Sequence, residues 1–156
     1  MKTKEFNPTS DERNEYPSAL LSLGDLANTL TKFASEHYAG LIDVEGGTDL
    51  SEPVRISPEG FAYLLKRVLR EINGRAILRI GISVVYPHAV IKFSSDDLSF
   101  INEGLIELAR LSGFNAEIAP SGELVLSAAV VKNPSLFVYS TSTEELLRRI
   151  LSAFYG

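Results

Sequence analysis

Few side chains in this sequence are of the types that carry out chemistry. The chain has no cysteine, which excludes disulfides, thiolate metal sites and a cysteine nucleophile. Its two histidines, His37 and His88, are too few for a histidine-rich metal site. The sequence also lacks a phosphate-binding glycine loop, a nucleophile elbow and a zinc-protease motif. No reaction can therefore be inferred from a local motif.

Two pairs of adjacent acidic residues are the remaining local candidates for a chemical role. Asp96-Asp97 and Glu144-Glu145 each stand where a helix is predicted to begin. Negative side chains at a helix N-terminus are stabilised by the helix dipole. A structural role therefore accounts for both pairs.

The charge balance limits the classes of partner. Fifteen Lys and Arg residues stand against 20 Asp and Glu, giving a net charge of −5, whereas a nucleic-acid surface needs a basic stripe that replaces phosphate counterions. No apolar run approaches the roughly 18 residues of a membrane span, and residues 1–16 contain no apolar signal core. We therefore expect a cytoplasmic protein that binds neither nucleic acid nor membranes.

The pattern of apolar residues predicts one domain with both helices and strands. Residues 1–17 are polar and charged and are predicted to form a flexible N-terminal arm, followed by a single domain over residues 18–156. Periodicities of three and four residues predict helices at 18–38, 58–72, 95–112 and 142–155. Short apolar segments between turn residues predict strands at 41–44, 54–56, 76–85, 89–94, 115–119, 123–131 and 136–139. The predicted class is α+β, a two-layer α/β sandwich whose mixed, mostly antiparallel sheet has helices on one face.

The second helix has the clearest signals. Ser57 is a suitable N-cap, and Pro58 fits the first helical position because its missing N–H costs nothing there. Three cations, Lys66, Arg67 and Arg70, form either a solvated face or an anion-binding site. They lie off an apolar stripe that is predicted to be core and consists of Phe61, Leu64, Leu65, Val68, Leu69 and Ile72.

The last predicted helix is also strongly amphipathic. A helix of this length is not stable alone in water, so its apolar side must dock on its own domain or on a second molecule. That apolar side consists of Leu146, Leu147, Ile150, Leu151 and Phe154.

The order of elements is more informative than any motif. From residue 20 to residue 131 it runs helix, short strand, extended segment, helix, two strands, helix and hairpin. The extended segment at 50–57 contains Pro53, a Leu64-Leu65 pair lies in the second helix, and Gly104 and Gly113 mark the third helix. This order resembles the ATP-binding domain shared by sensor histidine kinases and type II topoisomerases.

The residues at the chemical positions of that family depart from its pattern. The resemblance places its two asparagine-box positions on Arg67 and Glu71. Glutamate can bind magnesium through oxygen, but arginine cannot act as a base near neutral pH. The adenine-reading aspartate falls on Asp96 or Asp97, without the glycines that let backbone approach a nucleotide. Only residues 97–103 separate the strand from the third helix, which leaves no room for the lid of the family.

The resemblance therefore implies a degenerate relative that lacks the lid. Its expected role is a non-catalytic or regulatory protein-interaction domain in bacterial signal transduction, as a homodimer or with another regulator. No cofactor is expected; if the site is functional, Glu71, Asp96 and Asp97 would bind Mg-ATP, with Glu71 as the metal ligand. Three alternatives stay open: a divergent ATP-binding kinase-like domain, a phosphotransferase-like protein with His37 as its helical histidine, and an unrelated α+β domain.

Overall fold

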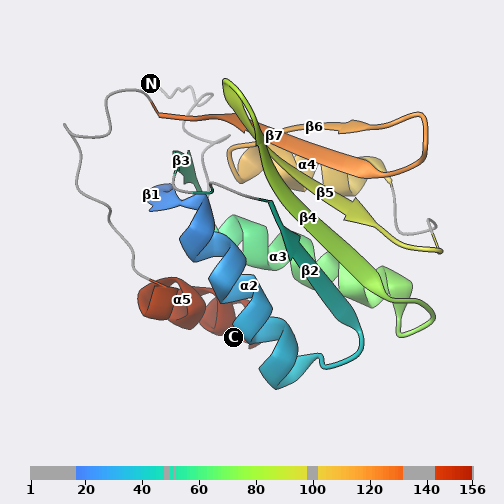
Figure 1. The fold of residues 1–156 in the computed structure, drawn as a ribbon. Helices are drawn as coiled ribbons and strands as arrows, with labels where there is room; N and C mark the ends of the chain where they lie inside the picture. The colour runs from blue at the N-terminus through green and yellow to red at the C-terminus, as the bar shows by residue number, and fades with distance from the viewer. Residues whose placement is uncertain (1–16, 48–49, 51, 98–101, 132–142, 156) are drawn as a thin grey trace, which may run out of the picture.

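The computed structural model describes residues 17–47, 50, 52–97, 102–131 and 143–155. Its main element is a five-stranded sheet in the order β2-β4-β5-β7-β6 (Figure 1). β2 pairs with β4 in parallel, and the other neighbouring strands are antiparallel. The predicted mixed, mostly antiparallel sheet is thus confirmed, with strands β2 (Ile42–Gly46), β4 (Leu78–Val85), β5 (His88–Ser94), β6 (Asn115–Ile118) and β7 (Leu124–Ala129).

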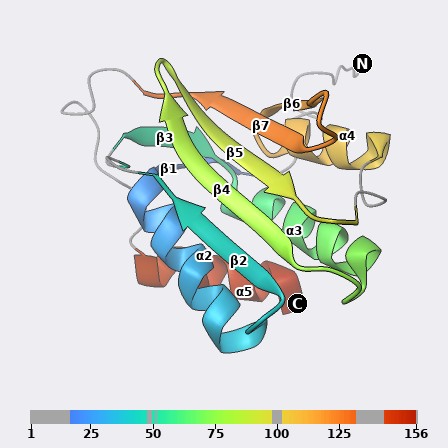
Figure 2. The same ribbon diagram turned by 45° about the vertical axis from the view of Figure 1, so that its right-hand side comes forward.

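One face of the sheet is buried and the other is open. On β4, Leu78, Ile80 and Ile82 are buried, whereas Arg79 between them is exposed. Successive residues of a strand point to opposite faces, so this alternation defines the inner side. Figure 2 shows the helices gathered on one side of the sheet. They are α2 (Leu23–His37), α3 (Pro58–Ile72), α4 (Glu103–Leu111) and α5 (Thr143–Tyr155).

Helix α3 begins and ends where the sequence predicts. The Ser57 hydroxyl accepts a hydrogen bond from the Gly60 amide at 3.0 Å, and Pro58 follows at the first helical position. Asn73 ends the helix in the left-handed conformation with φ 52°, and its N–H donates to the Leu69 carbonyl. Most of the predicted stripe is fully buried, but Leu69 is only partly buried. Leu69 is expected in the core, but the structure places it at the edge of the core, partly buried.

The first helix starts later than predicted. Strand β1 (Ala19–Ser22) pairs antiparallel with β3 (Pro53–Ile56) in a separate two-stranded sheet. Helix α2 begins at Leu23, because the Ser22 hydroxyl caps it by accepting from the Asp25 amide at 3.0 Å. The three apolar residues before Ser22 are all buried. An apolar run of that length suits either a strand or a helix, so periodicity alone could not distinguish them.

The third helix also starts later than predicted. Ser95 to Asp97 offer possible N-caps, but α4 begins at Glu103, with the Asn102 side chain accepting from the Leu105 amide at 3.1 Å. Three predicted features lie outside the described residues. They are the strand at 136–139, the first residue of the last helix, Ser142, and nearly all of the N-terminal arm. No helix among the residues described has the length and apolar character needed to cross a membrane.

Helix α5 docks on its own domain, against α2 and α3. Leu146 and Ile150 are fully buried, and the Phe154 ring meets the Phe33 ring edge to face at 5.1 Å between centroids. Arg149 holds Glu59 of α3 through two hydrogen bonds, of 2.6 and 3.0 Å. This half-buried, bidentate pair fixes the position of α5 along α3.

Two alanine substitutions on α3 test this assignment of its faces. Leu65→Ala should lower the free energy of unfolding by roughly 2–5 kcal/mol, because it leaves a cavity in the core. Leu69→Ala should cost about 1–2 kcal/mol, since part of that side chain is already in water. Urea unfolding followed by circular dichroism measures both values. Equal losses for the two variants would contradict the placement of Leu69 at the edge of the core.

Candidate functional site

Two of the three predicted site residues are brought together at the C-terminal end of α3. Glu71 lies in the last turn of α3, and Asp97 follows β5. Arg75 joins them: its Nε donates to Asp97 Oδ2 at 2.8 Å, and its Nη2 donates to the backbone carbonyl of Glu71 at 2.8 Å. The aspartate at the predicted adenine position is therefore engaged by a guanidinium of its own chain.

The turn after α3 explains why Arg75 lies there. Asn73 is left-handed, Gly74 has φ 75°, and the Arg75 N–H donates to the Ile72 carbonyl at 3.1 Å. Two consecutive residues with positive φ reverse the chain, and Asn and Gly are suited to this conformation. The Asn-Gly pair indicated the helix end, but the role of Arg75 was missed because its partner is distant in sequence.

Asp96 is directed away from this group. Its Oδ1 accepts a hydrogen bond from Arg79 Nη2 at 3.1 Å, and its side chain is 87% exposed. Arg79 lies on the open face of β4, opposite the buried Leu78 and Ile80. The two adjacent aspartates therefore pair with different arginines, and only Asp97 joins the end of α3.

Helices α3 and α4 pack closely along the side of α3 that carries Arg67 and Glu71. The Ser57 amide donates to the Ser112 carbonyl at 2.9 Å, next to Gly60. A Cβ on Gly60 would overlap the Ser112 hydroxyl and lie 2.8 Å from Ser112 Cβ. The first turn of α3 and the end of α4 are therefore in direct contact.

At the other end of this contact, Arg67 lies on the start of α4. Its Nη2 is 2.9 Å from the place that a Cβ of Gly104 would occupy, and Asn102 Oδ1 lies 3.1 Å from the same point. The two helices thus run antiparallel, with Gly60 beside Ser112 and Arg67 beside Gly104. Arg67, the predicted first asparagine-box position, therefore packs its guanidinium against a neighbouring helix.

The residues present do not fit a magnesium site at Glu71. The described residues contain no group of three or more His, Asp and Glu side chains that could hold a metal ion. Arg67 lies one turn before Glu71 on α3, and Arg75 contacts its backbone carbonyl. Two guanidinium groups near the end of α3 oppose the binding of a divalent cation there.

The comparisons with known proteins give structural matches only. No protein-family model matches the chain, and no curated protein matches it either. Among solved structures, the chain is similar to the histidine kinase AdeS of Acinetobacter baumannii, with 11% identity and a TM-score of 0.48 over 80% of this chain and 72% of that one. It is also similar to the catalytic domain of histidine kinase ThkA, with 13% identity and a TM-score of 0.48 over 77% of this chain and 99% of that one.

A third structural match is the cytoplasmic segment of histidine kinase QseC, with 17% identity and a TM-score of 0.42 over 74% of each chain. All three proteins are histidine kinases, the family that the order of elements resembles. At these identities and TM-scores the likeness concerns the fold and gives no residue of this chain a role.

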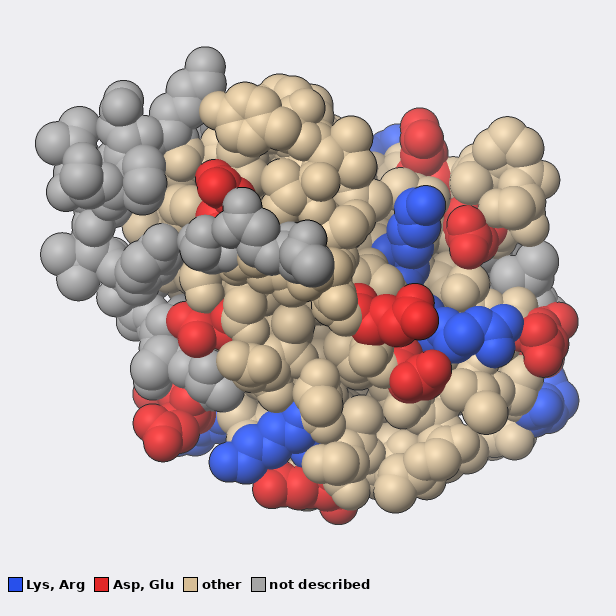
Figure 3. Space-filling model, viewed as in Figure 1, with Lys and Arg blue, Asp and Glu red and all other residues tan. Residues whose placement is uncertain are grey.

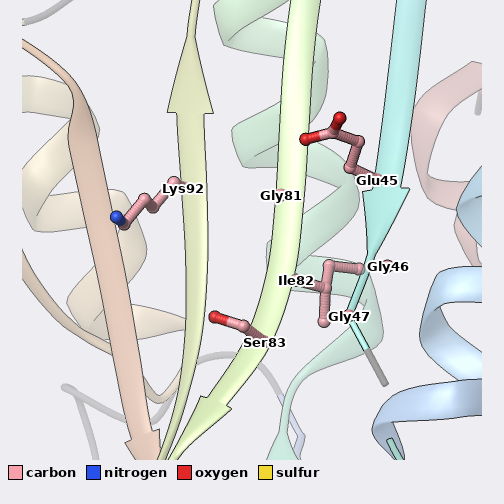
Figure 4. A pocket seen from close by; sticks show the side chains of 7 residues that line it. All are labelled: Glu45, Gly46, Gly47, Gly81, Ile82, Ser83 and Lys92. Carbon is pink, nitrogen blue, oxygen red and sulfur yellow. The ribbon is translucent and has the colours of Figure 1, made fainter.

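The open face of the sheet carries a shallow hollow of about 360 Å³ (Figure 4). Gly81 lies at its centre, between Glu45 on β2 and Lys92 on β5, in one row of the sheet. In Figure 4 the Lys92 side chain extends toward the neighbouring strand, away from Glu45. The face shown in Figure 3 likewise mixes acidic and basic side chains and has no continuous basic stripe.

An aromatic cluster joins the ends of α2 and α5. His37 contacts the rings of Phe33 and Tyr155, at 5.5 and 5.8 Å between centroids. Tyr38 packs on Phe154 at 5.7 Å. Burial, followed by the hydrogen bond with Tyr155, raises the pKa of Tyr38 to about 12. The fold therefore favours the protonated phenol of Tyr38.

The ionisation of Tyr38 should couple to stability at high pH. The pKa of Tyr38 is higher in the folded state than in the unfolded chain. Its contribution to the free energy of unfolding is therefore fully present below pH 10 and is lost as the pH rises toward 12. In an absorbance titration at 295 nm, Tyr155→Phe should lower the pKa of Tyr38, whereas Tyr86→Phe should leave it unchanged. Tyr38→Phe identifies the late transition by removing it. An unchanged late transition in Tyr155→Phe would show that the hydroxyl contact is absent.

Proposed function

We propose that this chain is a non-catalytic, regulatory protein-interaction domain with a kinase-type ATPase fold. It acts in the cytoplasm, in bacterial signal transduction, through a homodimer or a second regulator. The observation that carries the proposal is that side chains of this chain occupy the space between α3 and α4 and engage the predicted adenine-binding aspartate. Arg67 lies on the first turn of α4, and Arg75 is bound to Asp97.

Close helix packing supports the loss of nucleotide binding. A nucleotide between α3 and α4 would have to separate Gly60 from Ser112 and break the hydrogen bond from Ser57. Well-packed contacts of this kind resist separation, because the lost dispersion energy and the exposed backbone groups both cost free energy. Asp97 would also have to leave Arg75 before it could accept a hydrogen bond from a base.

Exposed apolar side chains at the ends of β4 support a role in protein interaction. Val85 and Tyr86, at the turn into β5, are 63% and 69% exposed. At the opposite end, Leu41 and Ile77 are also exposed and adjacent, since the Leu78 amide donates to the Leu41 carbonyl at 2.9 Å. Tyrosine is enriched among the anchor residues of protein interfaces, and exposed apolar groups that adjoin one another are typical of interaction surfaces.

One observation favours a divergent ATP-binding domain as the second candidate. Arg67 and Arg75 place two guanidinium groups near the end of α3, and guanidinium binds phosphate in a bidentate manner. In this alternative the triphosphate would displace Asp97 from Arg75. Nucleotide binding would then depend on both arginines.

Calorimetric titration with Mg-ATP distinguishes the two candidates. We expect no binding in the micromolar range, which corresponds to about −8 kcal/mol and needs an organised pocket. An NMR titration of backbone amides shows where any weaker binding occurs. Micromolar binding that shifts the amides of Arg67, Glu71 and Asp97, and that is lost in Arg67→Gln, would replace the proposal with the ATP-binding alternative. Lys92→Gln, on the open sheet face, is the control for a general loss of charge.

A further inference from the structure

A second hollow lies on a different side of α3 from Arg67 and Glu71, where the end of α5 packs. Its volume is about 550 Å³, and it is walled by the end of α2, the second half of α3 and the end of α5. This volume is within the roughly 300–1,000 Å³ of typical small-molecule sites. The three walls are distant in sequence, so the docking of α5 creates the hollow.

The hollow has an apolar floor between aromatic walls. Leu69 is partly exposed here, and the buried Phe154 lies beside it. Tyr38 and Tyr155 flank Phe154, with ring centroids at 5.7 and 5.0 Å from that of Phe154. These contacts place the three aromatic rings side by side along the hollow. Such a surface suits a flat apolar group.

Two unpaired cations stand at the rim. Lys66 and Arg70 line the hollow one turn apart on α3, and within the described part of the chain neither forms an ion pair or a hydrogen bond. Like charges at this spacing destabilise a helix slightly. No acidic residue lines the hollow, and the uncharged Asn73 is among its lining residues. By contrast, five other arginines are paired with carboxylates: Arg75, Arg79, Arg110, Arg148 and Arg149.

We propose that this hollow binds a small amphipathic anion, a flat apolar body that carries one phosphate or carboxylate. The body would lie on Leu69 and Phe154 between the two tyrosines, and Lys66 and Arg70 would hold the anionic group through charge-assisted hydrogen bonds. The sequence allows two interpretations of the cations on α3, a solvated face or an anion-binding site. The hollow favours an anion-binding site for Lys66 and Arg70. The site goes beyond the proposed function, because it lies on another side of α3.

The experiment titrates the full chain with 1-naphthyl phosphate and follows backbone amides by NMR. We expect the largest shifts at residues that line the hollow, Lys66, Leu69, Arg70, Asn73, Phe154 and Tyr155, and none at Asp97. Inorganic phosphate and the neutral 1-naphthalenemethanol should each bind at least about tenfold more weakly, since each lacks one half of the recognised chemistry. The double variant Lys66→Gln/Arg70→Gln should weaken binding of the probe by about tenfold or more. Lys92→Gln is the matched control and should bind as the parent does.

Four results would overturn the proposal. They are the absence of shifts at millimolar probe, shifts outside the hollow, equal binding by the double variant, and equal binding of inorganic phosphate or the neutral analogue.

Lys66 and Arg70 are exposed, so the double variant should fold, and circular dichroism checks this. Failure here leaves the Mg-ATP result unaffected, because Asp97 and Arg67→Gln report on the α4 side, whereas Phe154, Tyr155 and the double variant report on the hollow.

Discussion

The arrangement of the helices depends on the contact between Gly60 of α3 and Ser112 at the end of α4. A glycine inside a helix costs about 1 kcal/mol relative to alanine, and here its missing side chain lets Ser112 approach. The hydrogen bond from the Ser57 amide to the Ser112 carbonyl adds a polar link at the same point. Because the helices are antiparallel, this contact also brings Gly104 beside Arg67.

Helix α3 therefore has three occupied sides. One side forms the core under the sheet, one packs on α4, and one packs on α5 through the ion pair of Glu59 with Arg149. The α4 side carries Arg67 and Glu71, the predicted asparagine-box positions, and Arg67 packs against the start of α4. The α5 side leaves Lys66 and Arg70 without partners among the described residues. The proposed ligand site and the predicted asparagine-box positions are thus on different sides of the same helix.

Local signals in the sequence predicted the elements that they specify directly. Ser57-Pro58 and Asn73-Gly74 fixed both ends of α3, and alternation fixed the buried face of β4. The signals failed where two local solutions compete. The apolar residues before Ser22 suit a strand as well as a helix, and Asn102 caps α4 in place of Ser95 to Asp97.

Contacts between distant residues could not be predicted from one sequence. The pairing of Arg75 with Asp97 requires the turn after α3 to face the end of β5. Leu65 and Leu69 occupy equivalent positions on the apolar stripe of α3, but only Leu65 is fully buried. The partial exposure of Leu69 depends on where α5 stops covering α3, which is a tertiary feature. The site residues Glu71, Asp96 and Asp97 could be named by resemblance, but their partners follow from tertiary structure alone.

The free energy of unfolding of Gly60→Ala tests the closure of the α3–α4 side most directly. If Ser112 lies against Gly60, the new Cβ must overlap it, and the variant should lose roughly 1–3 kcal/mol as an overpacked contact does. Gly81→Ala is the control, because a Cβ there would meet no heavy atom within 4 Å. A gain of about 0.5–1 kcal/mol for Gly60→Ala, the ordinary effect of alanine in a helix, would mean that the helices are apart and would contradict the account.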